Sequence, residues 1–176
     1  MSRKYKFHNP EGIYFVSFAV QNWIYALTRV EYKNIIVESL RFCQRHKGLK
    51  IYAWVIMTNH VHLVISSEGQ LTLSEILRDF KRHTSKHIIK AIQDNPEENR
   101  KEWMLRQFST EKGWRFWRGD NQPIELWSNS VIDQKINYVH MNPVKAGLAF
   151  VPEDYMYSSA VNYAGEKGLL DVEVVL

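Results

Sequence analysis

The feature that most constrains this chain is a pair of apolar runs separated by a short polar break. Residues 49–57 and 60–66 are rich in β-branched and aromatic side chains, and Thr58 and Asn59 separate them. This pattern predicts two antiparallel strands joined by a tight turn. With 45% hydrophobic residues in a chain of 176, the sequence can bury such a hairpin in a core of ordinary size.

Two histidines lie on the second predicted strand. Because side chains alternate along a strand, His60 and His62 share one face, whereas residues 61, 63 and 65 face the other way and suit a core. Two imidazoles on one face can hold a metal ion. Two ordinary histidines on a half-exposed sheet would give the same pattern, so the hairpin alone leaves both interpretations open.

A second stretch narrows the interpretation. It reads Tyr138-Val139-His140-Met141-Asn142-Pro143-Val144-Lys145-Ala146-Gly147-Leu148, and it resembles the tyrosine-bearing helix of the single-tyrosine transposases. The segment Met57-Thr58-Asn59-His60-Val61-His62-Leu63 resembles the histidine–hydrophobic–histidine motif (HUH motif) of the same family. The closest resemblance is to REP-associated tyrosine transposases, and it extends from about residue 14 to about residue 163.

The order of elements predicts the fold class. A strand over 13–20, a helix over 30–47, the hairpin, a helix from Thr72 to about Asp94, a strand-like segment and a last helix indicate an α+β protein. We expect a mainly antiparallel sheet with helices packed on one face, and the resemblance implies a ferredoxin-like version. One transposase domain is expected over residues 1–176, with 1–12 a basic lead-in and 165–176 a C-terminal tail.

The helix boundaries follow from local signals. Gly48 is expected to end the helix over 30–47, and Thr72 with Glu75 three residues later forms a capping box. Asn129 or Ser130 is the expected N-cap of the last helix, which Asn142-Pro143 should stop after about residue 141. The alternating tail predicts a small added strand or a contact between molecules.

The side chains of the two motifs suit metal-assisted attack of a tyrosine on a phosphate. Tyr138 and Asn142 are four apart, so they share one face of a helix. A tyrosine hydroxyl is a weak nucleophile unless another group assists it, and a divalent metal can do so by neutralising the attacked phosphate. His60, His62 and Asn142 would supply two imidazoles and an amide oxygen to that metal. The resemblance implies that the metal is Mg²⁺ or Mn²⁺.

These features predict a single-stranded DNA transposase. Tyr138 would attack a DNA phosphodiester, form a 5′-phosphotyrosine and release a 3′-hydroxyl for strand transfer at sites marked by hairpin DNA. Two other functions stay open from the sequence. The first is a regulator that binds hairpin DNA without cutting it, and the second is a metal-dependent hydrolase of small phosphoesters.

The charge pattern suggests where DNA might lie. A net charge of +4 permits a polyanionic partner without requiring one. Basic residues recur on the 72–94 helix and alternate with aromatic residues over 114–118, where stacking on unpaired bases and packing in the core are both plausible. A solvated charged face is an equal alternative for the helix. The candidate DNA contacts are Arg78, Lys81, Arg82, Lys86, Arg115, Arg118 and Lys145.

The remaining sequence features concern location and assembly. The single cysteine, Cys43, excludes an internal disulfide framework and suits a core position in a reducing compartment. The sequence shows no signal peptide or membrane span, so we expect a bacterial cytoplasmic protein that acts at the nucleoid. The resemblance allows a monomer or a homodimer, in which the tyrosine helix is sometimes exchanged between subunits.

Overall fold

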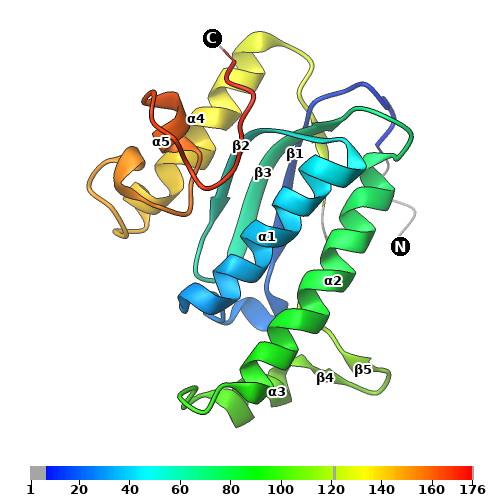
Figure 1. Cartoon of the computed structure of the whole chain (residues 1–176), viewed down its shortest axis with the longest axis vertical. Coiled ribbons are helices and arrows are strands. Elements are labelled where there is room, and N and C mark those ends of the chain that lie inside the picture. Colours follow the sequence, from blue (N-terminus) through cyan, green and yellow to red (C-terminus); the bar gives the residue numbers. More distant parts are fainter. Residues whose placement is uncertain (1–6, 121, 176) are drawn as a thin grey trace.

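The sheet at the centre of the molecule contains the expected hairpin (Figure 1). The computed structural model describes residues 7–120 and 122–175, so residues 1–6 of the expected basic lead-in and residue 176 of the tail lie outside the described part. The strands of the larger sheet are β1 (Tyr14–Ala19), β2 (Leu49–Ile56), β3 (His60–Ser67) and β6 (Ile124–Glu125). The main helices are α1 (Val30–Lys47), α2 (Leu73–Asp94), α3 (Lys101–Phe108) and α4 (Asn129–Lys145).

The sheet has the topology of a ferredoxin-like fold. Its order is β2-β3-β1-β6, and each neighbouring pair is antiparallel. Along the chain the order is β1, α1, β2, β3, α2 and β6, which is the split β-α-β arrangement. The predicted α+β class, the antiparallel sheet and the central position of the histidine strand are therefore confirmed.

The helices cover both faces of the sheet, and this corrects one expectation. α1 and α2 pack side by side on one face, as expected, whereas α4 lies against the other face (Figure 1). The reason is visible in β2 and β3, whose central residues are buried on both sides instead of alternating between core and solvent. A strand buried on both faces needs a layer of helix on each.

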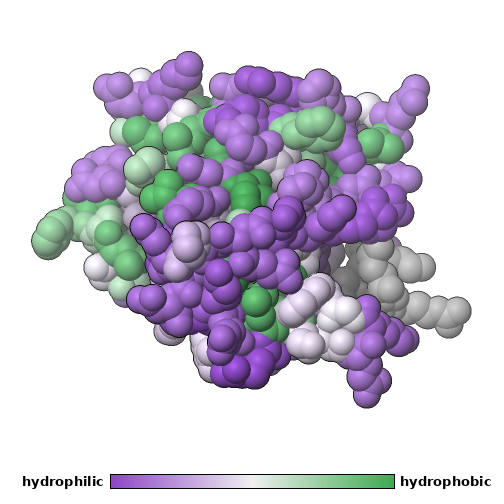
Figure 2. All heavy atoms as spheres, turned by 60° about the horizontal axis from the view of Figure 1, so that its bottom comes forward, coloured by the Kyte–Doolittle hydropathy of each residue, from purple (hydrophilic) through white to green (hydrophobic). Residues whose placement is uncertain are grey.

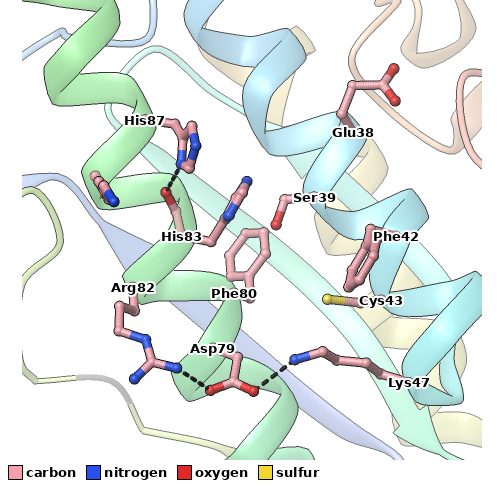
Figure 3. A pocket seen from close by; sticks show the side chains of 11 residues that line it. Glu38, Ser39, Phe42, Cys43, Lys47, Asp79, Phe80, Arg82, His83 and His87 are labelled. Carbon is pink, nitrogen blue, oxygen red and sulfur yellow. Dashed lines mark hydrogen bonds and ion pairs between the residues drawn. The ribbon is translucent and has the colours of Figure 1, made fainter.

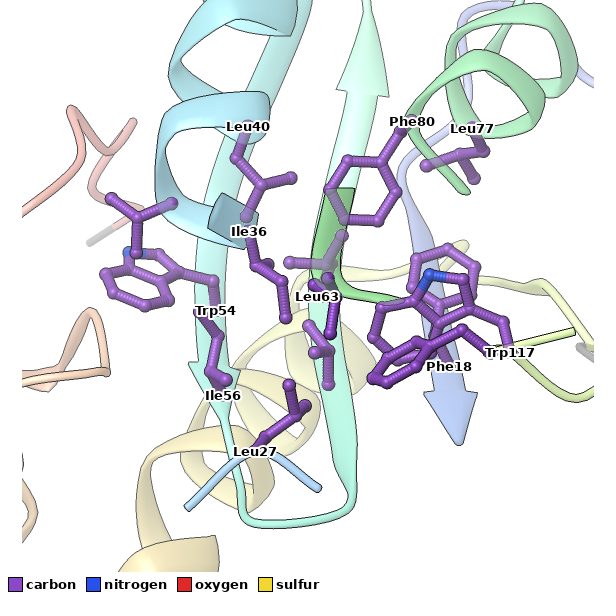
Figure 4. Close-up of a cluster of buried hydrophobic side chains, with 14 of the residues drawn as sticks. Phe18, Leu27, Ile36, Leu40, Trp54, Ile56, Leu63, Leu77, Phe80 and Trp117 are labelled. Atoms are coloured by element: carbon purple, nitrogen blue, oxygen red, sulfur yellow. The ribbon is translucent and has the colours of Figure 1, made fainter. Parts of the chain in front are cut away.

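The core beneath α1 and α2 is the larger one (Figure 4). Trp54, Leu63 and Phe80 are fully buried there, with Ile36 from α1 and Phe18 from β1 around them. Val61, Leu63 and Ile65 belong to this cluster, so the predicted inward face of β3 is confirmed. Cys43 is also buried in it, as expected.

A smaller core fixes α4. Ile132, Ile136 and Val139 of α4 pack against Val55 and Val64 of the sheet. These helix positions are three or four residues apart, so they form one apolar stripe. The stripe holds α4 on the sheet face that carries His60 and His62.

The boundaries of α1 and α2 agree with the sequence signals. Gly48 follows α1 in the left-handed conformation, with φ of 73°. The hydroxyl of Thr72 accepts from the backbone N–H of Glu75, and the Glu75 carboxylate accepts from the backbone N–H of Thr72. Both predicted caps are confirmed.

Both predicted ends of α4 were wrong. The N-cap is Ser128, whose Oγ accepts from the backbone of Val131. The helix continues through Pro143 to Lys145, because a proline in the last turn removes only one backbone hydrogen bond. The C-cap is Ala146, and Gly147 follows it. There the N–H of Gly147 donates to Val144 and the N–H of Leu148 donates to Pro143, which is a Schellman motif with Gly147 at φ of 71°.

The region between α2 and β6 contains a further helix and a short hairpin, and it resolves the ambiguity over residues 114–118. Residues 101–108 form α3, and β4 (Ser109–Thr110) pairs with β5 (Gly113–Trp114) in a short hairpin. In the aromatic run that follows, Phe116 and Trp117 are buried in the larger core, whereas Trp114 is exposed. The run therefore contains both core rings and a surface ring.

Short segments pair with both edges of the sheet. Ile56 donates to Tyr157, Ser159 donates to Trp54, and Glu173 donates to Ile51 along the outer edge of β2. The tail thus packs on its own chain, and no strand forms within its described residues, 165–175, where an added strand was one expectation. At the other edge, Arg118 donates to Ala19 of β1. The remaining elements are η1 (Gln21–Trp23), η2 (Pro152–Asp154) and α5 (Ala160–Tyr163).

Within the described ranges, 7–120 and 122–175, none of the helices has the length and hydrophobicity required to cross a membrane.

Gly48 and Gly147 offer a matched test of the packing at the α1–β2 junction. Their φ angles are 73° and 71°, but a Cβ at Gly48 would lie 1.6 Å from the Glu68 carbonyl oxygen, whereas one at Gly147 would meet nothing within 4 Å. We expect Gly147→Ala to lower the free energy of unfolding by about 1–2 kcal/mol through backbone strain. Gly48→Ala should cost at least roughly twice as much by urea unfolding, and equal losses would contradict the assigned contact.

Candidate active site

The two histidines of β3 lie together beneath α4. His60 pairs with Ala19 and His62 with Ser17 across the β1–β3 ladder, and the centroids of the two imidazole rings are 4.6 Å apart. His62 is only 7% exposed, and His60 is half-buried. The pair therefore forms a partly covered cluster at the end of the sheet near the 58–59 turn.

Each imidazole is held through its Nδ1 atom. His60 Nδ1 lies 2.7 Å from Asn59 Oδ1, and His62 Nδ1 lies 2.6 Å from Ser17 Oγ. These contacts orient the rings and leave Nε2 as the second nitrogen of each histidine. Metal-binding histidines commonly use this arrangement, in which one ring nitrogen contacts a neighbouring oxygen and the other contacts the metal.

The surroundings keep both histidines neutral. Burial, followed by electrostatic repulsion from His60 and Lys135, lowers the pKa of His62 to about 3. Burial also lowers the pKa of His60, against the opposing effect of a hydrogen bond with the Asn142 side chain. Neutral imidazoles keep the nitrogen lone pairs that metal coordination requires.

α4 brings Tyr138 and Asn142 to the same cluster. The centroid of the Tyr138 ring is 5.4 Å from that of His62 and 5.8 Å from that of Phe15. Asn142 lies close enough to His60 to raise the pKa of that imidazole against the effect of burial, and its Nδ2 donates to the Tyr138 carbonyl over 3.2 Å. Tyr138 is 39% exposed, so a ligand at the surface can reach its ring. The structure thus brings together all four residues that the sequence singled out.

Two lysines flank the tyrosine. Lys135 Nζ lies 5.1 Å from the centroid of the Tyr138 ring and 4.6 Å from that of Phe15. Lys145 Nζ lies 6.0 Å from the Tyr138 ring. All three distances suit cation–π contact, and both cations would face a phosphate that approached the tyrosine.

The donor set bears on the choice of metal. The described ranges, 7–120 and 122–175, hold no cluster of three or more His, Cys, Asp or Glu side chains arranged for a metal ion. A metal at β3 would therefore have two imidazole nitrogens and the Asn142 amide oxygen as protein ligands. Mn²⁺ accepts such mixed sets readily, whereas Mg²⁺ prefers oxygen ligands and water.

The basic residues of α2 lie on the other side of the sheet. Asp79 pairs with Arg82 and, over 2.7 Å, with Lys47 of α1 (Figure 3). Arg78 also contacts Asp79. Arg82 and Lys86 line a groove of about 620 Å³ between α1 and α2. The sheet separates this groove from the histidines.

The other predicted DNA contacts lie in separate places. Lys86 and Arg115 line a groove of about 580 Å³ between α2 and the β4–β5 hairpin, together with exposed Trp114. Lys81 also lines this groove, but its Nζ donates to the carbonyl of Arg118 over 3.2 Å. Arg118 contacts the Trp23 ring, with its guanidinium carbon 5.0 Å from the centroid, whereas Lys145 lies beside Tyr138 and adjoins the candidate active site.

A comparison with known protein families shows which family the chain belongs to. The profile of the family described as "Transposase IS200 like" matches residues 20–114, which is more than half of the chain. The chain belongs to the family of IS200-like transposases. The matched part of this transposase contains both histidines and ends before α4, so the tyrosine helix lies outside the match. No curated protein sequence matches the transposase.

Solved structures agree with the fold of the transposase. A REP-associated tyrosine transposase bound to a REP hairpin matches 100% of this chain and 94% of its own chain, with a TM-score of 0.69 and 17% identity. A candidate transposase from Deinococcus radiodurans R1 has a TM-score of 0.47 and 15% identity, over 78% of this chain and 95% of its own. The first of these likenesses confirms the fold.

Sequence reasoning missed three residues of the site. Ser17 interrupts an apolar run over 13–20, and that polar break was a usable signal. Lys135 is three residues before Tyr138, so helix periodicity places it near the same face. Phe15 carried no signal, because its contact with Tyr138 depends on how α4 crosses the sheet.

Burial of the histidines predicts acid-sensitive stability. Burial lowers the pKa of His140 to about 4 and that of His62 to about 3, whereas in the unfolded chain both titrate near about 6.5. The unfolded state therefore binds more protons below that pH, and stability falls as the pH falls. Between pH 7.5 and 5 we expect a loss of about 2 kcal/mol per histidine in EDTA, measured by urea unfolding.

His140 supplies the control for this prediction, because its Nε2 contacts Ser159 Oγ, away from the cluster. His140→Gln, which cannot take up the proton, should remove the contribution of one histidine, about 2 kcal/mol between pH 7.5 and 5, from the pH dependence of the unfolding free energy. An unchanged slope would contradict the assignment.

Proposed function

We propose that this transposase cleaves and rejoins single-stranded DNA with Tyr138 as the nucleophile. The observation that carries the proposal is the position of the Tyr138 ring, 5.4 Å from that of His62 and partly open to solvent. A phenol used only for packing would have no need of two neutral imidazoles, an amide and two lysines around it.

The proposed reaction exchanges one phosphodiester bond for another. The Tyr138 hydroxyl oxygen attacks the phosphorus, the bond from phosphorus to the 3′ oxygen breaks, and the departing oxygen takes up a proton as the phenol loses one. The products are a 5′-phosphotyrosine and a free 3′-hydroxyl. A 3′-hydroxyl can later attack the phosphotyrosine and reverse these changes, so strand transfer requires no external energy source.

His60, His62 and Asn142 are the proposed ligands of a Mg²⁺ or Mn²⁺ ion. When bound, the cation would neutralise the attacked phosphate and orient it for in-line displacement. The contacts of Asn59 and Ser17 hold the two imidazoles in place, and the hydrogen bond from Asn142 Nδ2 to the Tyr138 carbonyl orients the third ligand. Lys135 and Lys145 add positive charge beside the phenol.

The proposed substrate is a DNA strand with a hairpin next to the cleavage site. The REP-associated transposase of similar fold is bound to a REP hairpin, which favours the same class of partner here. Lys145 adjoins the site, Arg118 contacts the Trp23 ring, and the proposed hairpin contacts farther away are Arg78, Lys81, Arg82, Lys86 and Arg115. The proposed place of action is the bacterial cytoplasm, at the nucleoid.

Loss of the phenol provides the first test. We expect Tyr138→Phe to bind hairpin-bearing single-stranded DNA with wild-type affinity but to form no covalent protein–DNA adduct, because the ring stays and the attacking oxygen is absent. Denaturing electrophoresis with labelled DNA and Mn²⁺ measures the adduct. An adduct in the variant would exclude Tyr138, and no adduct in the wild-type protein would favour a regulator that binds without cutting or a phosphoesterase.

Mixing two inactive variants tests how the site is assembled. Because Tyr138 lies beside His62 of its own chain, we expect a mixture of His60→Ala and Tyr138→Phe to remain inactive. Adduct formation by the mixture would show that subunits exchange the tyrosine helix. Light scattering on the same samples gives the oligomeric state.

Metal affinity tests the ligands without catalysis. We expect His62→Ala and Asn142→Ala each to weaken Mn²⁺ binding at least tenfold by titration calorimetry. His87→Ala is the matched control, because this histidine is exposed on α2, across the sheet from the site. Equal affinity in all four proteins would contradict the proposed metal site.

A further inference from the structure

Trp23 extends the row of rings that begins at Tyr138. Its ring centroid is 6.5 Å from that of His60, and the Arg118 guanidinium carbon lies 5.0 Å from the Trp23 ring. From Tyr138 through His62 and His60 to Trp23, neighbouring centroids are 5.4, 4.6 and 6.5 Å apart. The row leads from the candidate nucleophile to a tryptophan that is 51% exposed.

The backbone holds Trp23 in an unusual conformation. Asn22 and Trp23 both have φ of 56°, a region that bulky residues rarely occupy. Asn59 Nδ2 donates to the Trp23 carbonyl over 3.1 Å, and Asn22 Nδ2 donates to Gln107 over 2.9 Å. These bonds maintain a strained turn whose tryptophan contributes little to the core, so the turn presents the indole beside His60.

The Arg118 guanidinium contacts the indole, and its charge is already paired with a carboxylate. Its Nε donates to Asp120 Oδ1 over 3.0 Å, so its guanidinium is already paired. A cleft of about 430 Å³ adjoins it, lined by Gln21, Asn22, Arg118, Gly119 and Asp120. The guanidinium is already paired, and the indole is exposed beside a polar cleft. This place therefore suits the binding of a flat, uncharged ring better than the binding of a second phosphate group. Figure 2 shows one face of the molecule, which is mostly hydrophilic, with hydrophobic residues in separate groups.

We infer that Trp23 is a stacking site for one unpaired base of the DNA strand, a few nucleotides from the phosphate that Tyr138 attacks. The inference rests on the proposed function, because it identifies the strand as the substrate. Indole stacking accepts any base, since every base has a π-face, and it requires that the base be unpaired. Trp23 therefore selects single-stranded over duplex DNA beside the reacting phosphate.

Affinity for DNA tests the inference without cleavage. The probe is a fluorescein-labelled oligonucleotide in which a DNA hairpin is flanked by unpaired thymidines, measured by anisotropy in EDTA. We expect Trp23→Ala to bind about tenfold to a hundredfold more weakly, and Trp23→Phe to retain most of the affinity. Circular dichroism establishes that the variants are folded.

Trp127→Ala is the matched control. Trp127 is 80% exposed, and its neighbour Leu126 pairs with Ile13, at the opposite end of β1 from Ala19 and His60. The control should bind like the wild-type protein. Equal losses for Trp23→Ala and Trp127→Ala, wild-type binding by Trp23→Ala, or an equal loss on blunt duplex DNA would overturn the inference.

Abasic sites in the probe identify the stacked base on unaltered protein. We expect one unpaired position at which removal of the base weakens binding by the wild-type protein but not by Trp23→Ala. The absence of any such position would also overturn the inference. These binding measurements do not require a covalent adduct. A negative cleavage assay would therefore not contradict the stacking site, and a negative binding result would not contradict Tyr138 as the nucleophile.

Discussion

The packing of α4 on the histidine-bearing face of the sheet is the interaction on which the rest of the structure depends. Three apolar side chains of this helix, at positions 132, 136 and 139, meet the valines of β2 and β3. Helical geometry then determines where Tyr138 and Asn142 lie, because they sit on the same turns as that stripe. Without this layer the histidines would be a surface pair on an open sheet, and no phenol would stand beside them.

Much of the fold follows from local patterns in the sequence. The apolar runs around Thr58 and Asn59 predicted the hairpin, the alternation on β3 predicted which residues enter the core, and Thr72 with Glu75 predicted the start of α2. The errors concern α4. Pro143 suggested a stop, but a proline in the last turn costs one hydrogen bond, and Gly147 ends the helix instead. The pattern of an amphipathic helix also does not reveal which sheet face it covers.

The site was predictable where it lies on one element and unpredictable where it depends on how elements meet. Residues 60 and 62 share a strand face, and 138 and 142 share a helix face, so their spacing alone grouped them. Ser17 meets His62 through the β1–β3 register, which no single segment of sequence contains. No pattern in the sequence singled out Trp23, because its position beside His60 depends on a positive φ and on neighbours at positions 59 and 118.

The coverage of both sheet edges has a consequence for how this protein meets others. Residues 157–159 and 173 occupy the free side of β2, while β6 and the backbone around Arg118 occupy that of β1. An unpaired strand edge is a template for strand addition, and through it for aggregation. Here segments of the same chain pair with the outer side of β2 and with the end of β1 beyond β6, so little of these two strands is left open to strand addition by another copy.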